Sequence, residues 1–403
     1  MQNHPADQEP RRVLGSFFAP KSQNTPTWEQ RKLVELTKTI TTGKSVNSDE
    51  GEVSDGDIGV LKTSCVSYDR FNPSESKPVV KSEQQLVKCA VEKDSVIVSR
   101  MNTPERVGAC GYVSTDFPNL FLPDRLWKLK FQDTVDTYFV YMMLVSSAYK
   151  EKITSMASGT SGSMYNIPKE TFLNLQLVIP AKIDEQKQLG KILKKIDTLI
   201  TLHQRKYEKL VNIKKSMLDK MFPKNGASVP EIRFKGFTDL WEQRKLGEMV
   251  DVCSGMDYKH LSEGDIPVYG TGGYMLSVNK ALSYDRNAVG IGRKGTIDKP
   301  YILKAPFWTV DTLFYAIPKD SKNIDFTFDV FQKVDWKKKD ESTGVPSLSK
   351  IAINETSIST PSKLEQERIG SLFRNLDTLI TLHQRKLEKL QNIKKSCLEK
   401  MFV

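Results

Sequence analysis

Apolar residues recur at steps of three and four along two long segments of the chain. This heptad spacing predicts two long helices, at 181–222 and 361–403. The pattern is interrupted by His203 and Lys206 in the first segment and by His383 and Lys386 in the second, and such a polar layer can fix the register of paired helices. A metal site shared by the two His residues is the alternative. The apolar positions that we assign to the seam of these subunit-contact helices are Leu189, Ile196, Leu199, Leu210, Ile369, Leu376, Leu379 and Leu390.

The segments that precede these helices have a different pattern. Residues 28–180 and 241–360 contain short alternating runs of β-branched and aromatic residues, separated by Gly and Pro, which are typical of strands and turns. The Pro- and Gly-containing stretch FPKNGASVP ends the first helix and begins a linker at 223–240. Residues 1–27 form an N-terminal tail for which disorder is one interpretation. The predicted class is α+β, with two α/β domains and two long helices.

The two halves of the chain repeat each other. Residues 196–222 and 376–402 are identical at 22 of 27 positions, including DTLITLHQRK in both copies, and WEQRKL occurs at 28–33 and again at 241–246. Repeats of this size indicate a duplication of two large parts rather than a solenoid. Two nearly identical helices in one chain can pair with each other. We therefore expect an antiparallel coiled coil with an internal pseudo-twofold axis.

The two strand-rich segments share a weak skeleton in the same order. GVLKTS (59–64) aligns with PVYGTG (267–272), DSVIVSRMNT (94–103) with NAVGIGRKGT (287–296), and DRLWKL (124–129) with DTLFYA (311–316). The second alignment places an Arg at the end of a strand in both segments, and the planar guanidinium of Arg can bind guanine at two atoms. The candidate DNA-binding residues in these loops are Lys62, Thr63, Ser64, Arg100, Asn102, Thr103, Arg106, Arg125, Tyr269, Thr271, Arg293, Lys294 and Thr296.

The charge of the chain permits a polyanionic partner. The formal net charge is +11, and residues 191–222 hold nine Lys or Arg against three Asp or Glu. A solvated basic helix face and a surface that binds DNA phosphate or a partner subunit both fit this excess. The five Cys residues form no CxxC pair, which favours a reducing cytoplasm. The sequence shows neither a signal peptide nor an apolar run long enough for a membrane span.

The motifs of common enzymes are missing. GIGRKG (290–295) fits the glycine pattern of dinucleotide-binding folds, but the Pro-containing, strand-like stretch that follows cannot supply the required helix. The sequence also lacks the metalloprotease, nucleophile-elbow and amino-methyltransferase motifs, and its four His residues are dispersed. Three hypotheses remain: a DNA-recognition subunit without catalytic residues, a stand-alone DNA-modifying enzyme, and a coiled-coil scaffold that binds other partners.

The order of variable segment, repeated helix, variable segment and repeated helix resembles the specificity subunits (HsdS) of type I restriction–modification systems. The resemblance covers nearly the whole chain from about residue 28. It is carried by the duplicated DTLITLHQRK helix, the EQxxxG entry to each helix and the WEQRKLGE opening. The segment 99–130 is similar to one recurrent type of target-recognition domain, and the segments 266–275 and 288–316 together are similar to another. The lead PEIRFKGF before the second WEQRKL has no counterpart before the first.

The resemblance implies a specific role. Each target-recognition domain would read one half of a bipartite target in double-stranded DNA, and the paired helices would set the spacer between the halves. Two methyltransferase subunits would bind the helices, and ATP-dependent restriction subunits would join the complex. This chain would hold no cofactor and no metal, since S-adenosylmethionine, ATP and Mg are expected in the partner subunits. The expected location is cytoplasmic, with no membrane contact.

Overall fold

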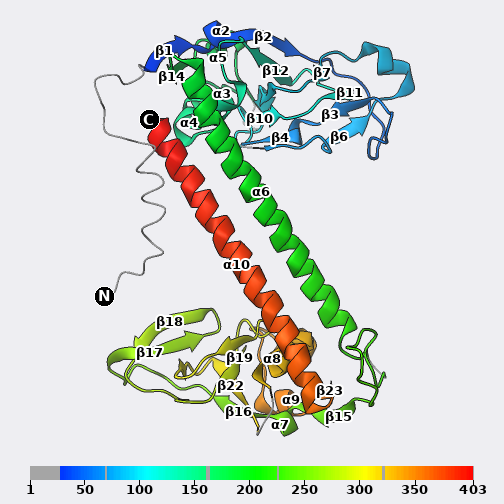
Figure 1. The fold of residues 1–403 in the computed structure, drawn as a ribbon, viewed down its shortest axis with the longest axis vertical. Coiled ribbons are helices and arrows are strands. Elements are labelled where there is room, and N and C mark those ends of the chain that lie inside the picture. The colour runs from blue at the N-terminus through cyan, green and yellow to red at the C-terminus, as the bar shows by residue number, and fades with distance from the viewer. Residues whose placement is uncertain (1–27, 69, 160–163, 225–226, 320–322, 403) are drawn as a thin grey trace. The chain divides into compact units, whose positions relative to one another are not determined.

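The computed structural model describes residues 28–68, 70–159, 164–224, 227–319 and 323–402. The tail predicted at 1–27 lies outside these residues. The chain divides into two compact units (Figure 1). The first unit contains the chain up to Thr201 together with Glu388–Val403, and the second unit contains Leu202–Leu387.

The core of the first unit is an antiparallel four-stranded sheet. Its order is β10 (Cys110–Val113), β8 (Ser95–Ser99), β12 (Leu126–Phe131) and β2 (Thr37–Thr42). Strand β8 is buried along its whole length. Val96 and Val98 pack toward α3 (Thr137–Leu144), whereas Ile97 faces a second cluster on the other side. Burial on both faces explains why SVIVS is a continuous rather than alternating apolar run.

A second sheet of the first unit packs on the far side of β8. It has the order β6 (Ser76–Pro78), β3 (Gly59–Leu61), β11 (Phe117–Phe121) and β7 (Ala90–Val91), with β3 and β11 parallel. Smaller elements complete the unit: α4 (Ser147–Ser155), η2 (Thr63–Cys65), η3 (Lys81–Leu86), and the strand pairs β4 (Val66–Ser67) with β5 (Arg70–Phe71) and β9 (Met101–Asn102) with β13 (Tyr165–Asn166).

The second unit has the same strand order. Its four-stranded sheet is β16 (Val250–Ser254), β22 (Leu313–Pro318), β19 (Ala288–Gly292) and β20 (Tyr301–Leu303), which correspond in turn to β2, β12, β8 and β10. Its other sheet is β18 (Gly273–Val278), β17 (Glu263–Gly270) and β21 (Trp308–Thr309), and β17 and β21 are parallel as β3 and β11 are. Helix α8 (Ile324–Lys333) takes the place of α3, and η4 (Trp336–Lys339) follows it. The prediction of one shared architecture is confirmed.

The repeated WEQRKL segments form the same local structure in both units. Strand β1 (Trp28–Lys32) pairs with β14 (Gln176–Pro180), and β15 (Glu242–Lys245) pairs with β23 (Ser357–Thr360). Each opening strand leads into one helical turn, α2 (Leu33–Leu36) or α7 (Leu246–Met249), and each closing strand follows a short helix, α5 (Lys169–Leu173) or α9 (Lys350–Asn354).

The two long helices are α6 (Ile183–Lys220) and α10 (Lys363–Met401). They pair antiparallel within each unit, as the heptad pattern predicts. In the first unit Lys394 Nζ lies 2.8 Å from Asp197 Oδ1, and in the second unit Lys214 Nζ lies 2.5 Å from Asp377 Oδ1. The two ion pairs occupy equivalent positions of the repeat, because each residue of one pair is 180 positions from its counterpart in the other.

The apolar helix positions divide between the cores and the surface. Leu189 and Ile196 pack on the core of the first unit, and Ile369 and Leu376 on that of the second. Leu199, Leu210 and Leu390 are half-buried. Leu379 is exposed, with an exposed fraction of 43%. The fully buried residues that the pattern did not select are Leu193 and Phe373, because the helices bury a wider stripe against the domains than against each other.

The shared EQxxxG motif connects each long helix to its domain. Gln186 accepts a hydrogen bond from the backbone of Asp136, which caps α3, and donates to the carbonyl of Pro180. Gly190 lies against the same cap, since a Cβ atom there would come 2.5 Å from Asp136 Oδ1. A Cβ atom at Gly370 would likewise come 2.7 Å from the backbone nitrogen of Phe326. The motif is therefore explained by close packing in both units.

Candidate nucleic-acid interface

In the first unit, Arg100 follows β8 and is held at the end of the central sheet. Its backbone nitrogen donates to the carbonyl of Arg125 (3.2 Å), and its side-chain Nε donates to the carbonyl of Asp124 (2.9 Å). The guanidinium carbon lies 6.0 Å from the ring centre of Trp127. These contacts use one edge of the guanidinium, so that the donors of its other edge remain for a ligand.

In the second unit, Arg293 follows β19 and has matching contacts. Its backbone nitrogen donates to the carbonyl of Thr312 (2.8 Å), and Nη1 lies 3.5 Å from the carbonyl oxygen of Asp311. The guanidinium carbon lies 5.8 Å from the ring centre of Phe314. The two Arg residues, aligned from weak sequence similarity, thus occupy equivalent positions at the same end of equivalent sheets.

The structure brings the other candidates of the first unit around Arg100. The loop that contains Lys62, Thr63 and Ser64 is connected to Glu75, which accepts from Ser64 Oγ at 2.7 Å and lies 3.9 Å from Lys62 Nζ. Thr63, Lys62 and Ser64 are half-buried, as is Arg100. The exposed candidates of this unit are Thr103, Arg106 and Arg125.

Asn102 is a correction to the predicted set. It is 8% exposed, and its side-chain nitrogen donates to Ser99 Oγ (3.0 Å) and to the carbonyl of Thr63 (3.4 Å). Its side-chain oxygen accepts from the backbone nitrogen of Thr103 (2.9 Å). Because the amide is used on both sides, Asn102 joins the loops at 63 and 103 rather than contacting DNA directly.

The candidates of the second unit also lie together. The backbone nitrogen of Val310 donates to the carbonyl of Tyr269, which connects β17 to the 310–312 loop that holds Arg293. The backbone of Lys294 forms an isolated antiparallel β-bridge with that of Ser347. Arg293 and Lys294 are exposed, whereas Tyr269, Thr271 and Thr296 are half-buried. Sequence reasoning missed Tyr274 and Met275 on the neighbouring strand, both of which are exposed.

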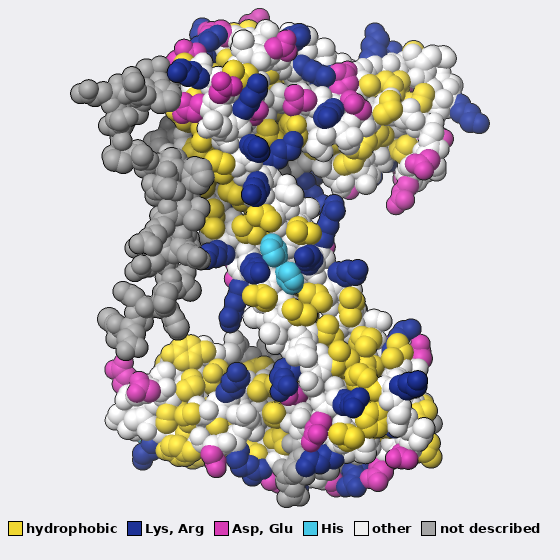
Figure 2. Space-filling view, in the orientation of Figure 1, with side chains coloured by type: hydrophobic (Ala, Val, Ile, Leu, Met, Phe, Trp, Pro, Cys, Tyr) yellow, Lys and Arg dark blue, Asp and Glu magenta, His cyan; other side chains and the backbone are white. Residues whose placement is uncertain are grey.

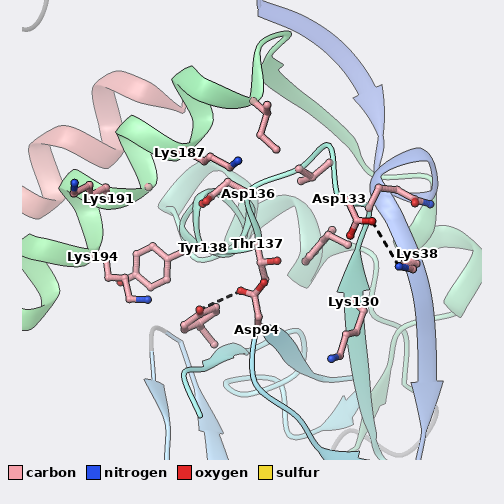
Figure 3. A pocket seen from close by; sticks show the side chains of 16 residues that line it. Lys38, Asp94, Lys130, Asp133, Asp136, Thr137, Tyr138, Lys187, Lys191 and Lys194 are labelled. Carbon is pink, nitrogen blue, oxygen red and sulfur yellow. Dashed lines mark hydrogen bonds and ion pairs between the residues drawn. The ribbon is translucent and has the colours of Figure 1, made fainter. Parts of the chain in front are cut away.

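A cavity of about 750 Å³ lies in the first unit (Figure 3). Asp94 precedes β8 and Lys130 lies near the end of β12, so this cavity is at the opposite end of the sheet from Arg100. Its other wall is α6, where Lys194 Nζ lies 5.3 Å and 5.5 Å from the ring centres of Tyr112 and Tyr138. Burial raises the pKa of the Tyr138 hydroxyl, which also donates to Asp197 (2.5 Å). The cavity is thus separate from the predicted DNA-binding loops.

The polar layer of the helices is a pair of imidazoles. Nδ1 of His203 lies 2.8 Å from Nδ1 of His383, so one ring donates and the other accepts. Figure 2 shows these His side chains in cyan with dark blue Lys and Arg side chains around them. Burial, His383 and the lysines Lys386 and Lys206 lower the pKa of His203, which favours the neutral form of its ring. In the described parts of the chain, no three His, Cys, Asp or Glu side chains are grouped to hold a metal ion.

Comparisons with known proteins agree with this architecture. The sequence profile of the type I restriction modification DNA specificity domain matches residues 26–212 and 238–392. The chain therefore belongs to this family, and its function is sequence-specific DNA recognition in a type I restriction–modification system. The family match does not favour a coiled-coil scaffold without DNA specificity.

Two relatives show how far the similarity extends. The chain is 23% identical over 298 residues to the type I restriction enzyme MjaVIII specificity subunit of Methanocaldococcus jannaschii. The aligned region covers 64% of this chain and 68% of that protein. It shares its fold with the S subunit of a type I restriction–modification system from M. genitalium, with a TM-score of 0.71, 19% identity and coverage of 95% and 98% of the two chains. None of the described helices is long and apolar enough to cross a membrane.

Proposed function

We propose that each unit reads one half of a bipartite target in double-stranded DNA. The observation that carries this proposal is the equivalence of Arg100 and Arg293, which end matching strands of two sheets with the same order and have matching backbone contacts. The loops around the two Arg residues differ in sequence, so the two half-sites would differ as well. Direct base contacts and sequence-dependent DNA shape would both contribute to the specificity.

The paired helices would bind partner subunits. Their sequences are nearly identical over 196–222 and 376–402, so they present the same exposed side chains twice. This duplication supports the binding of two copies of one methyltransferase subunit, with ATP-dependent restriction subunits joining the complex. In this assignment the chain itself is non-catalytic. S-adenosylmethionine, ATP and Mg would be bound by the partner subunits, and the complex would act on DNA in the cytoplasm.

The proposed function can be tested by mapping DNA methylation. The chain would be expressed with its methyltransferase subunit in a host without adenine methylation, and modified adenines would be located by long-read sequencing. A split motif with one methylated adenine in each half is the expected result. A continuous motif, or no motif from an assembled complex, would contradict the proposal.

The two Arg residues give a more specific prediction. Arg100→Ala is expected to relax base preference in one half-site only, and Arg293→Ala in the other only. A direct base contact by Arg contributes ~1–3 kcal/mol of discrimination. Each variant is the matched control for the other, and the same methylation map measures both. Uniform weakening at all sequences would instead identify the mutated Arg as a phosphate contact.

A further inference from the structure

The hairpin of β17 and β18 ends in a glycine-rich tip. Gly270 pairs with Gly273, and the turn between them consists of Thr271 and Gly272. Gly273 has a φ of +106°, a conformation that side-chain-bearing residues rarely adopt. Without side chains on these three Gly residues, the tip is narrow, and a two-stranded ribbon of this kind can enter a groove of DNA.

A β-bulge lies directly behind the tip. Val268 pairs with Leu276, but the next residue on β17, Tyr269, pairs with Tyr274, so Met275 is an extra residue on β18. A bulge interrupts the regular alternation of side chains and re-aims them. The exposed fractions are 63% for Tyr274 and 49% for Met275. The Tyr274 hydroxyl lies 3.2 Å from Ser277 Oγ and its ring centre 6.4 Å from that of Tyr269, while a Cβ atom on Gly270 would come 2.8 Å from Met275 Sδ.

The bulged tip lies beside the loop that holds Arg293. A Cβ atom on Gly270 would come 3.5 Å from Val310 Cγ2, and the carbonyl of Tyr269 accepts from the Val310 nitrogen. The carbonyl oxygens of the next two residues, 311 and 312, contact Arg293. The exposed aromatic and thioether pair is therefore connected through Gly270 and Val310 to the loop that contacts the exposed Arg293, and an aromatic residue combined with a basic one suits nucleic acid better than an apolar protein surface.

The first unit replaces this tip with a different structure. Its corresponding strands, β3 and β6, are connected by residues 62–75, which include η2, β4 and β5. The aromatic residues of that segment, Tyr68 and Phe71, are both half-buried. The Tyr68 hydroxyl donates to the carbonyl of Val107 (2.7 Å), and Phe71 packs against the core cluster around Ile97. Within the described residues, the exposed bulge pair thus belongs to the second unit alone.

We propose that Tyr274 and Met275 form a wedge that contacts a base step in the half-site read by the second unit. In this inference, which rests on the proposed bipartite DNA reading, Arg293 contacts a base edge while the Tyr274 ring and the Met275 side chain press against an adjacent step. Apolar side chains inserted at a base step partly unstack it, and flexible pyrimidine–purine steps deform most easily. The second half-site is then read partly through the deformability of this base step.

The test uses the full chain in its complex with the methyltransferase subunit and a duplex that carries the mapped target. Single 2-aminopurine substitutions along the second half-site report unstacking as an increase in fluorescence on binding. The wild-type complex is expected to give this increase at one step. The Tyr274→Ala/Met275→Ala variant is expected to abolish it and to weaken binding roughly 5- to 150-fold. The conservative variant Tyr274→Phe/Met275→Leu is expected to retain both properties.

The matched control is Tyr284→Ala, because Tyr284 has the same exposed fraction of 63% in the same unit but lies outside the hairpin. It should leave fluorescence and binding unchanged. If the wild-type complex binds its split target with no fluorescence change and the double alanine variant binds equally well, the wedge is wrong while bipartite reading stands. Loss of complex assembly in the alanine variant, with DNA binding by the chain intact, would assign the tip to a protein partner and also overturn the wedge. Failure of the wild-type complex to recognise any split target would instead reject the proposed function itself.

Discussion

Replacing Arg233 with Ala is expected to lower the free energy of unfolding of the second unit by about 3–5 kcal/mol. Arg233 Nε and Nη2 donate to the two carboxylate oxygens of Glu365 at 2.7 Å each. The side chain of Glu365 is 1% exposed, and that of Arg233 is 14% exposed. Removing the guanidinium therefore leaves a buried carboxylate without its charged partner, which is the costly way to break a buried ion pair.

The measurement is denaturant unfolding followed by the fluorescence of Trp241, Trp308 and Trp336, which all lie in the second unit. The control is Arg244→Ala, because Arg244 pairs with Glu242 at the surface and such pairs contribute about 0–1 kcal/mol. A loss of stability no larger than that of the control would show that Glu365 is paired or solvated without Arg233.

This ion pair also explains a difference between the two repeats. Arg233 belongs to the PEIRFKGF lead that precedes only the second WEQRKL. In the first unit the equivalent carboxylate, Glu185, accepts instead from the indole of Trp28 (3.2 Å), and its other oxygen has no partner among the described residues. In the second unit the indole nitrogen of Trp241 has no such partner. The PEIRFKGF lead therefore supplies a charged guanidinium to Glu365, whereas the equivalent Glu185 of the first unit is bound by a neutral indole.

Asp329→Asn is expected to stabilise the second unit at neutral and mildly alkaline pH. Asp329 is 1% exposed on α8, and one of its carboxylate oxygens has no hydrogen-bond partner among the described residues. Burial raises its pKa from 3.8 to about 9, with Asp377 and Asp325 adding to the increase and Lys214 opposing it. Burial of an unpaired carboxylate favours its protonated form, which a neutral amide resembles in shape and charge.

The sign of the pH dependence follows from the proton binding of the two states. The folded state holds the proton at pH values where the unfolded state has released it, so stability falls as pH rises from about 3.8 to about 9. The Asn variant lacks this contribution, so its advantage over the wild type should grow by about 1.4 kcal/mol for each pH unit within this window.

Urea unfolding at pH 5, 6.5 and 8 measures this difference, which should grow at each step. Asp335→Asn is the control, because Asp335 is exposed and pairs with Lys338 at the surface. A constant difference between Asp329→Asn and the wild type across this range would mean that Asp329 does not change protonation with folding.

The long helices and the duplication could be predicted from the sequence because each produces a pattern that is visible in the order of the residues alone. Heptad spacing and literal repetition need no knowledge of tertiary contacts, and the shared order of Val60, Arg100 and Asp124 with Val268, Arg293 and Asp311 was enough to indicate one fold. The burial of individual charged residues was harder to predict. Asp329 resembles a solvent-facing position in a short amphipathic helix, and only the packing of α8 against both long helices places it inside.

The candidate site was predictable at the level of loops but not of single side chains. The sequence placed Asn102 beside Arg100 in a polar loop, and nothing local indicated that its amide would be satisfied by Ser99, Thr63 and Thr103. The exposure of Tyr274 and Met275 depends on a bulge that comes from the pairing of β17 with β18 and cannot be read from either strand alone.

The pairing of β1 with β14 and of β15 with β23 has a consequence for how such a chain can change. In register, Trp28 lies opposite Pro180 and Glu242 opposite Thr360, so the chain enters and leaves each recognition region at the same point. The residues between the two paired strands are therefore an insertion between the strand pair and the long helix that follows it. The two ends of this insertion stay close together whatever its length. The segment between Lys32 and Gln176 is longer than that between Lys245 and Ser357, yet both close onto the same strand-to-helix junction. A whole reading surface can therefore be exchanged as a cassette without disturbing the helices that partners would hold.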